Sequence, residues 1–121
     1  MRLLVVDGAN VVGSRPDGWW KDRAGAARRL HDRLLRADLG HDEVVLVLEG
    51  AAKAGVRVGQ DLHVRTVHAP RDGDSEIVRL ATAAREAGDR CTVVTADRAL
   101  GDLVAARGAF VMGPSWLLDQ L

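Results

Sequence analysis

Short apolar runs alternate along this chain with longer segments of helical periodicity. The runs Leu3–Val6, Val44–Leu48 and Cys91–Val94 contain no charged residue, as expected of strands that are covered on both faces. Between the runs, residues 20–39 and 74–87 carry apolar side chains at helical spacing. Because a helix that links two strands usually brings them side by side and parallel, we expect an α/β fold. The pattern predicts a three-layer α/β/α sandwich with a mostly parallel central sheet.

The remaining segments complete this expectation. Residues 13–18 are predicted to form a turn, and residues 50–61 a loop that leads into an edge strand, Leu62–Val67. Further predicted elements are a helix over 98–106, a strand over 109–112 and a helical turn over 114–121. Gly40 and Ser115 are expected to cap helices, Cys91 to be a buried thiol, and Trp19, Trp20 and Trp116 to cover the core.

Length and charge limit the classes of protein to which the chain can belong. A chain of 121 residues indicates a single domain, residues 1–121. Seventeen basic side chains balance seventeen acidic ones, whereas tight binders of long nucleic acids are usually basic. The lone cysteine excludes an internal disulfide, and no run is long enough for a signal peptide or a membrane span. We therefore expect a cytoplasmic protein whose contacts with nucleic acid are local and transient.

Acidic residues follow the predicted buried strands. Asp7, Glu49 and Asp97 come at the strand ends, and Asp74 lies in the first turn of a predicted helix. Because the carboxyl ends of parallel strands meet at one edge of the sheet, these carboxylates should lie close together. Their mutual repulsion would favour a cation, and oxygen ligands with open positions suit Mg²⁺ or Mn²⁺. Such an ion can activate water and stabilise charge on phosphorus.

Each acid also has a purely structural explanation. Asp74 and Asp97 could cap helix N-termini or complement the helix dipole. Asp7 could be a turn residue before Gly8, and Glu49 a solvated strand end. The recurrence of acids after three strands on one edge favours a functional site.

Three motifs in this sequence resemble those of NYN domains, especially the bacterial YacP-like branch. They are Val6–Gly13 (VDGANVVG), Gly73–Ile77 (GDSEI) and Val93–Arg98 (VVTADR). The resemblance implies a PIN-like fold, a divalent-metal site and hydrolysis of RNA phosphodiesters that leaves a 5′-phosphate and a 3′-hydroxyl. It maps Asp7, Asp74 and Asp97 onto the metal-ligand positions and gives Asn10 a positioning role.

Two departures from the family pattern keep a second hypothesis open. Glu49 stands where a shorter aspartate is common, and Ala99 stands where PIN domains often carry another acid. Asp102, about one helical turn further on, is the nearest substitute. The alternative is a catalytically weak or inactive module that binds RNA or the ribosome. A magnesium-dependent phosphatase ranks last, because the acid-x-acid arrangement of such enzymes is missing.

The leading hypothesis assigns roles to ten residues. Asp7, Asp74 and Asp97 bind one or two Mg²⁺ or Mn²⁺ ions with help from Glu49, and Asn10 and Thr95 orient water or phosphate. The expected RNA contacts are Arg98, Arg71, Arg15 and Lys21. Trp19 and Trp20 could instead stack on unpaired bases. A second copy of the chain, or a ribosomal or other protein partner, could help to position the RNA, and no membrane partner is expected.

Overall fold

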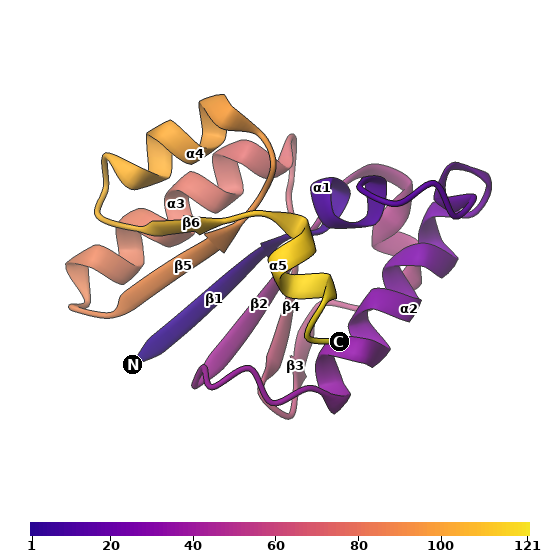
Figure 1. Cartoon of the computed structure of the whole chain (residues 1–121), viewed down its shortest axis with the longest axis horizontal. Coiled ribbons are helices and arrows are strands. Elements are labelled where there is room, and N and C mark those ends of the chain that lie inside the picture. The colour runs from indigo at the N-terminus through magenta and orange to yellow at the C-terminus, as the bar shows by residue number, and fades with distance from the viewer.

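A computed structural model describes residues 1–121 and shows one six-stranded sheet between two helical layers (Figure 1). The strand order is β3-β4-β2-β1-β5-β6, and every neighbouring pair is parallel except β3 and β4. This architecture confirms the α/β sandwich with a mostly parallel sheet. The strands are β1 (Arg2–Asp7), β2 (Glu43–Leu48), β3 (Gly59–Asp61), β4 (Val64–His68), β5 (Arg90–Val94) and β6 (Phe110–Met112).

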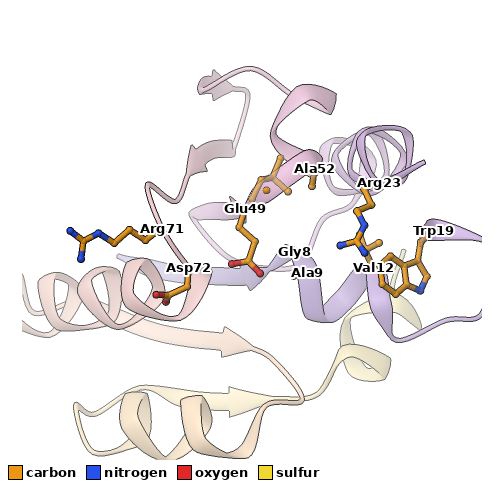
Figure 2. Close-up of a pocket in the computed structure, with 11 residues that line it drawn as sticks. Gly8, Ala9, Val12, Trp19, Arg23, Glu49, Ala52, Arg71 and Asp72 are labelled. Atoms are coloured by element: carbon orange, nitrogen blue, oxygen red, sulfur yellow. The ribbon is translucent and has the colours of Figure 1, made fainter. Parts of the chain in front are cut away.

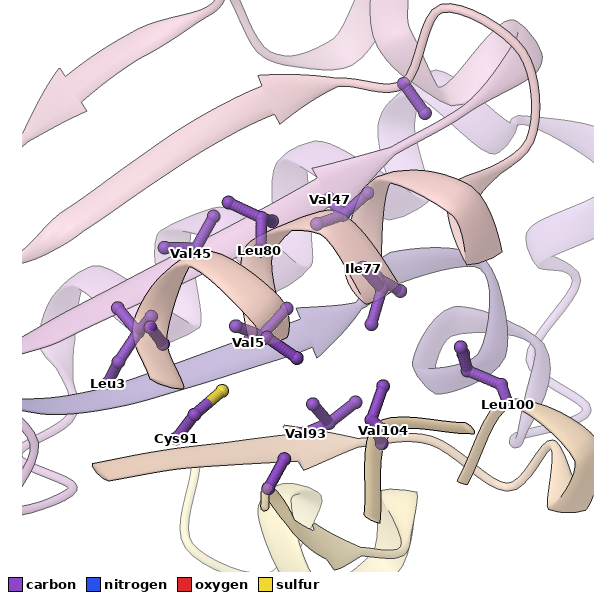
Figure 3. Close-up of a cluster of buried hydrophobic side chains, with 14 residues drawn as sticks. Leu3, Val5, Val45, Val47, Ile77, Leu80, Cys91, Val93, Leu100 and Val104 are labelled. Atoms are coloured by element: carbon purple, nitrogen blue, oxygen red, sulfur yellow. The ribbon is translucent and has the colours of Figure 1, made fainter. Parts of the chain in front are cut away.

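The two faces of the sheet are covered by different helices. The helices are α1 (Gly8–Gly13), α2 (Arg23–Arg36), α3 (Gly73–Glu86), α4 (Arg98–Ala105) and α5 (Pro114–Leu118), with 3₁₀ turns at Trp19–Lys21 and Gly50–Gly55. Alternate residues of β1 face opposite sides, so Val5 packs with α3 and α4, and Val6 packs with α1, α2 and α5. Figure 3 shows the first of these two cores, in which Ile77 and Leu100 lie over the sheet.

The predicted edge strand is not at the edge. The strand begins at Val64 instead of Leu62, and it pairs on one side with β2 and on the other with β3. β3 lies inside the segment 50–61 that was predicted to be a loop. Leu62 is 79% exposed and has a positive φ of 51°, so it forms the tight turn between the two antiparallel strands.

Several predicted helix ends are also wrong. α2 begins at Arg23, because Asp22 caps it by accepting a hydrogen bond from the Gly25 amide at 2.8 Å. It ends at Arg36, and Gly40 lies beyond it in a separate turn with a φ of +70°. α5 begins at Pro114 after Gly113, so Ser115 lies inside the helix and does not cap it.

The tryptophans agree only in part with the expectation that they cover the core. Trp20 is 51% exposed, and Trp19 is half-buried beneath the guanidinium of Arg23, which lies 5.1 Å from the ring centroid. At the C-terminus Leu117 is fully buried, whereas Trp116 is half-buried against the same core. The thiol of Cys91 is buried as predicted. None of the helices has the length and apolar character required to cross a membrane.

Candidate functional site

The acidic residues predicted from the strand ends lie at one edge of the sheet. β1 ends at Asp7, Glu49 directly follows β2, and Asp97 lies just beyond β5. Because β1 pairs in parallel with both β2 and β5, these three positions share the carboxyl edge. Burial is the largest cause of the raised pKa of both Asp7 and Asp74; the charges of Asp74 and Glu49 add to it at Asp7, and those of Asp97, Asp72 and Glu49 add to it at Asp74. The four side chains therefore form one electrostatically coupled group.

Asp7 is the buried member of this group, with 5% of its surface exposed. Burial is the main reason that its pKa is raised, and the charges of Asp74 and Glu49 add to that effect. Two hydrogen bonds oppose it. The Thr95 hydroxyl donates to Asp7 Oδ2 at 2.9 Å, and the Asn10 amide donates to Oδ1 at 3.4 Å. These bonds hold the carboxylate in one orientation at the start of α1.

Thr95 and Asn10 connect the ends of β1 and β5. The Thr95 oxygen, besides donating to Asp7, accepts a hydrogen bond from the Asp97 amide at 3.1 Å. The Asn10 side-chain oxygen accepts one from the Ala96 amide at 2.9 Å. Both side chains thus set the position of the segment that carries Asp97 relative to Asp7.

The capping explanation holds for Asp97 but not for Asp74. Asp97 Oδ1 accepts from the Leu100 amide at 3.1 Å at the start of α4. At the start of α3 the cap is Asp72, which accepts from the Ser75 amide at 2.7 Å. Asp74 makes no hydrogen bond to the protein through its side chain, and its raised pKa is caused by partial burial and then by its acidic neighbours. Asp74 therefore lies in this charged group without a capping role.

Glu49 joins the end of β2 to the start of α3. Its Oε2 atom accepts a hydrogen bond from the Gly73 amide. A side chain at Gly73 would place its Cβ 3.2 Å from that oxygen, so the absence of a side chain permits the close approach. Glu49 is the member of the acidic group that also faces a neighbouring cavity.

The oxygen atoms of the acidic group are suitable ligands for a divalent cation. Carboxylate oxygens are the ligands that Mg²⁺ and Mn²⁺ prefer, and a cation would relieve the repulsion that raises the pKa values of Asp7 and Asp74. The arrangement is more open than a closed metal cage, because no three acidic, histidine or cysteine side chains are grouped closely enough to hold an ion together. Mg²⁺ commonly keeps several waters and uses only one or two protein carboxylates, which suits such an open group.

The basic residues proposed to contact RNA occupy different places. Arg71 lies just before α3, beside Asp72, and borders the same cavity as Glu49. Arg98 is exposed at the first position of α4, next to Asp97. The guanidinium of Arg15, after α1, lies 3.6 Å from Asp119, after α5. Lys21 is exposed in the 3₁₀ turn before α2.

A cavity of about 390 Å³ opens beside the acidic group (Figure 2). Glu49 and Asp72 border it on one side, and Trp19 with the overlying Arg23 borders it on the other. Gly8, the residue after Asp7, also lies in its wall. The sequence interpretation considered Trp19 as a base-stacking residue but did not identify the cavity or Asp72. Asp72 could have been identified from its place before Gly73, where an N-cap residue is expected.

Comparisons with known proteins agree with this fold. The model of the YacP-like NYN domain family matches residues 4–121. The crystal structure of Rae1 (YacP) from Bacillus subtilis is similar, with a TM-score of 0.79 and 22% sequence identity over 98% of this chain and 72% of that chain. A mutant of the same protein gives a TM-score of 0.78 and 21% identity, over 98% of this chain and 74% of that chain. No curated protein sequence matches. The family match covers nearly the whole chain, and the chain therefore belongs to the YacP-like NYN domain family and has its PIN-like fold.

Proposed function

We propose that this protein is a metal-dependent endoribonuclease that hydrolyses RNA phosphodiesters at the carboxyl edge of its sheet. The observation that carries the proposal is the placement of Asp7, Glu49, Asp74 and Asp97 from four separate segments in one repelling group. Such a group costs stability, because Asp7 is buried while its neighbours oppose its ionisation. Perturbed carboxylates that gather beside a cavity are typical of functional sites. Family membership favours a nuclease among the functions that such a site could have.

In this proposal Asp7, Asp74 and Asp97, assisted by Glu49, would bind Mg²⁺ or Mn²⁺, with one or two of the carboxylates in direct contact and the others acting through waters that the ion keeps. When bound, the cation neutralises charge on the phosphodiester and lowers the pKa of water. Asp97 has one oxygen engaged with the Leu100 amide, which leaves its second oxygen for this task. Asp74 has both oxygens free of hydrogen bonds to the protein.

The other residues of the site position these carboxylates and the RNA. Thr95 orients Asp7 through its hydroxyl, and Asn10 fixes the Ala96 amide in the loop that leads to Asp97. Arg71, just before α3, and Arg98, at the first position of α4, are the proposed contacts to phosphate oxygens. Because the net charge is zero, these contacts provide the local attraction that the protein as a whole lacks.

A second candidate is an RNA- or ribosome-binding module that retains the fold without catalysis. The open arrangement of the carboxylates and the presence of Ala99 near them favour this alternative. Substitution distinguishes the two functions, because removal of one carboxylate abolishes hydrolysis but leaves the binding of a non-catalytic module unchanged.

The test is cleavage of labelled single-stranded RNA by wild type and Asp97→Asn, with Mn²⁺, with Mg²⁺ and with chelator. Asparagine caps helices as well as aspartate does, so α4 should remain intact. Glu86→Gln is the control, because it removes one exposed carboxylate at the end of α3 that lies away from the carboxyl edge of the sheet. We expect metal-dependent cleavage that is lost in Asp97→Asn and kept in Glu86→Gln. Equal activity in all three proteins would refute the site, and no cleavage by any of them would favour the binding module.

A further inference from the structure

The cavity beside the acidic group has the features of a binding site for one flat, partly polar ring. We propose that it binds an unpaired nucleobase of the RNA, next to the phosphate that lies at the carboxylates. This inference rests on the proposed ribonuclease function and adds to it the way in which single-stranded RNA is recognised. Its volume of about 390 Å³ lies at the small end of the range for ligand sites, which is about 300–1,000 Å³.

One wall of the cavity is a preformed stacking surface. The ring of Trp19 carries the Arg23 guanidinium at 5.1 Å, and the edge of Trp20 braces it at a centroid distance of 5.9 Å and an interplanar angle of 89°. The Trp19 amide donates to Asp17 Oδ1 at 3.2 Å, which fixes the backbone at this point. Tryptophan and arginine faces both stack on bases, and they do so with little dependence on sequence. Val12 extends this apolar wall.

The opposite wall supplies polar groups. Glu49 and Asp72 border the cavity, and carboxylate oxygens accept hydrogen bonds from the ring and amino N–H groups of bases. Both Asp72 oxygens already accept from Ser75, so Glu49 is the available acceptor. Glu49 uses Oε2 for the Gly73 amide, and no protein donor contacts its Oε1. Figure 2 shows the Glu49 carboxylate between Asp72 and the Trp19–Arg23 wall. A ring held between these walls would meet the Arg23 guanidinium and the Trp19 ring on one side and hydrogen-bond acceptors on the other.

The position of the cavity connects it with the proposed chemistry. Gly8 lies in its wall and directly follows Asp7, while Glu49 belongs both to the cavity and to the acidic group. Arg71 borders the cavity, and Figure 2 shows its side chain directed outward, away from Glu49. A nucleotide whose phosphate lies at the carboxylates therefore has its own base, or the neighbouring base, within reach of the cavity. A paired base cannot enter, because its Watson–Crick edge and stacking faces are occupied, so the site selects single-stranded RNA.

The experiment uses the fluorescence of Trp19 to report RNA binding at the cavity. The chain has three tryptophans, so Trp20→Phe and Trp116→Phe together leave Trp19 as the only one. Asp97→Asn is added so that the RNA stays intact. Trp19 fluorescence is then titrated with a short oligouridylate, with an abasic ribose-phosphate oligomer of the same length, and with an RNA hairpin that has no unpaired bases in its stem. We expect saturable quenching by the oligouridylate and little change with the other two.

Affinity gives a second readout. We expect Trp19→Ala to weaken binding of the oligouridylate by about 5- to 150-fold, the range for one stacked base. Phe110→Ala is the control, because this aromatic side chain is exposed in β6 and does not border the cavity, and it should leave the affinity unchanged. If Trp19→Ala unfolds, the fluorescence titration still decides, since it keeps Trp19.

The outcomes separate this inference from the proposed function. Equal quenching by the abasic oligomer, or no quenching while fluorescence anisotropy shows that the oligouridylate is bound, would overturn the base site. Neither result would affect cleavage that depends on Asp97. Conversely, base-dependent quenching, together with no RNA cleavage by the wild-type protein with any metal, would support the base site and refute the nuclease.

Discussion

Replacement of Thr95 by valine should destabilise the protein through the charge of Asp7. The Thr95 hydroxyl is buried, donates to Asp7 Oδ2 at 2.9 Å and accepts from the Asp97 amide at 3.1 Å. Valine has nearly the same shape, so packing is retained while both hydrogen bonds are lost. A hydrogen bond to a charged group contributes about 1.5–3 kcal/mol. We expect Thr95→Val to lower the free energy of unfolding by about 2–3 kcal/mol at neutral pH, without metal.

The size of this loss should depend on pH. The Thr95 hydrogen bond favours ionised Asp7 in the folded state and so lowers a pKa that burial raises. Without the bond, the folded-state pKa of Asp7 moves further above the unfolded value. The loss of unfolding free energy caused by Thr95→Val is therefore complete above that raised pKa. It becomes smaller as the pH falls through the raised pKa toward the ordinary value of 3.8. At the acidic end about 1 kcal/mol should remain, the contribution of a bond between neutral groups.

Urea unfolding in chelator at several pH values measures both effects. With a slope of about 1–3 kcal/mol per M urea, the midpoint at neutral pH should fall by roughly 1 M. Thr66→Val is the matched control, because the Thr66 hydroxyl is fully buried in β4 and has no hydrogen-bond partner. That variant should be neutral or more stable by about 1 kcal/mol. A cost for Thr95→Val that matches the control, or that does not change with pH, would show that Asp7 does not depend on this hydroxyl.

Three further predictions concern single side chains. Asp74→Asn should stabilise the metal-free protein by a few tenths of a kcal/mol in urea unfolding at low salt, and by less at high salt, because this exposed charge is repelled but screened. Gly8→Ala should cost about 1–3 kcal/mol in the same assay, since its Cβ would lie 2.6 Å from the Val47 carbonyl oxygen. Gly13→Ala, with 3.7 Å to the nearest atom, should be tolerated. Burial raises the pKa of Cys91 to about 11, so iodoacetamide should label its thiol only after unfolding. Mass spectrometry detects the label.

The strands that sequence predicts well are those buried on both faces. β1 and β2 consist mainly of valine and leucine, and β5 ends in two buried valines; the limits of all three strands agree with the prediction to within a residue or two. β3 (GQD) has no apolar run, because it is held by backbone pairing to β4 alone. Its position, and hence the inner position of β4, depends on long-range pairing that local patterns do not report.

For the site too, the features that follow from the sheet topology were predictable, whereas the local features were not. The convergence of Asp7 and Asp97 follows from parallel strands, and the sequence predicts it. α1 was not predicted, because six residues rich in glycine resemble a turn, and the helix depends on the Asp7 cap and the burial of Val11. The cavity was not predicted either. Its walls come from the segments around Trp19, Glu49 and Asp72, and no local pattern predicts the space between them.

The two aspartates that end β1 and lead into α4 serve the fold and the proposed site at the same time. Asp7 accepts from the Asn10 amide at the start of α1, and Asp97 accepts from the Leu100 amide at the start of α4. An N-cap needs only a side-chain oxygen, which asparagine supplies, whereas a cation site needs the negative charge.

At Asp97 the two roles can therefore be separated, because Asp97→Asn keeps the capping oxygen and removes only the charge. At Asp7 they cannot be separated so cleanly, because Oδ2 also accepts from Thr95, whose oxygen is already bound to the Asp97 amide. An amide group at position 7 would disturb this chain of hydrogen bonds, so a loss of activity in Asp97→Asn identifies a functional carboxylate more directly than the same loss in Asp7→Asn.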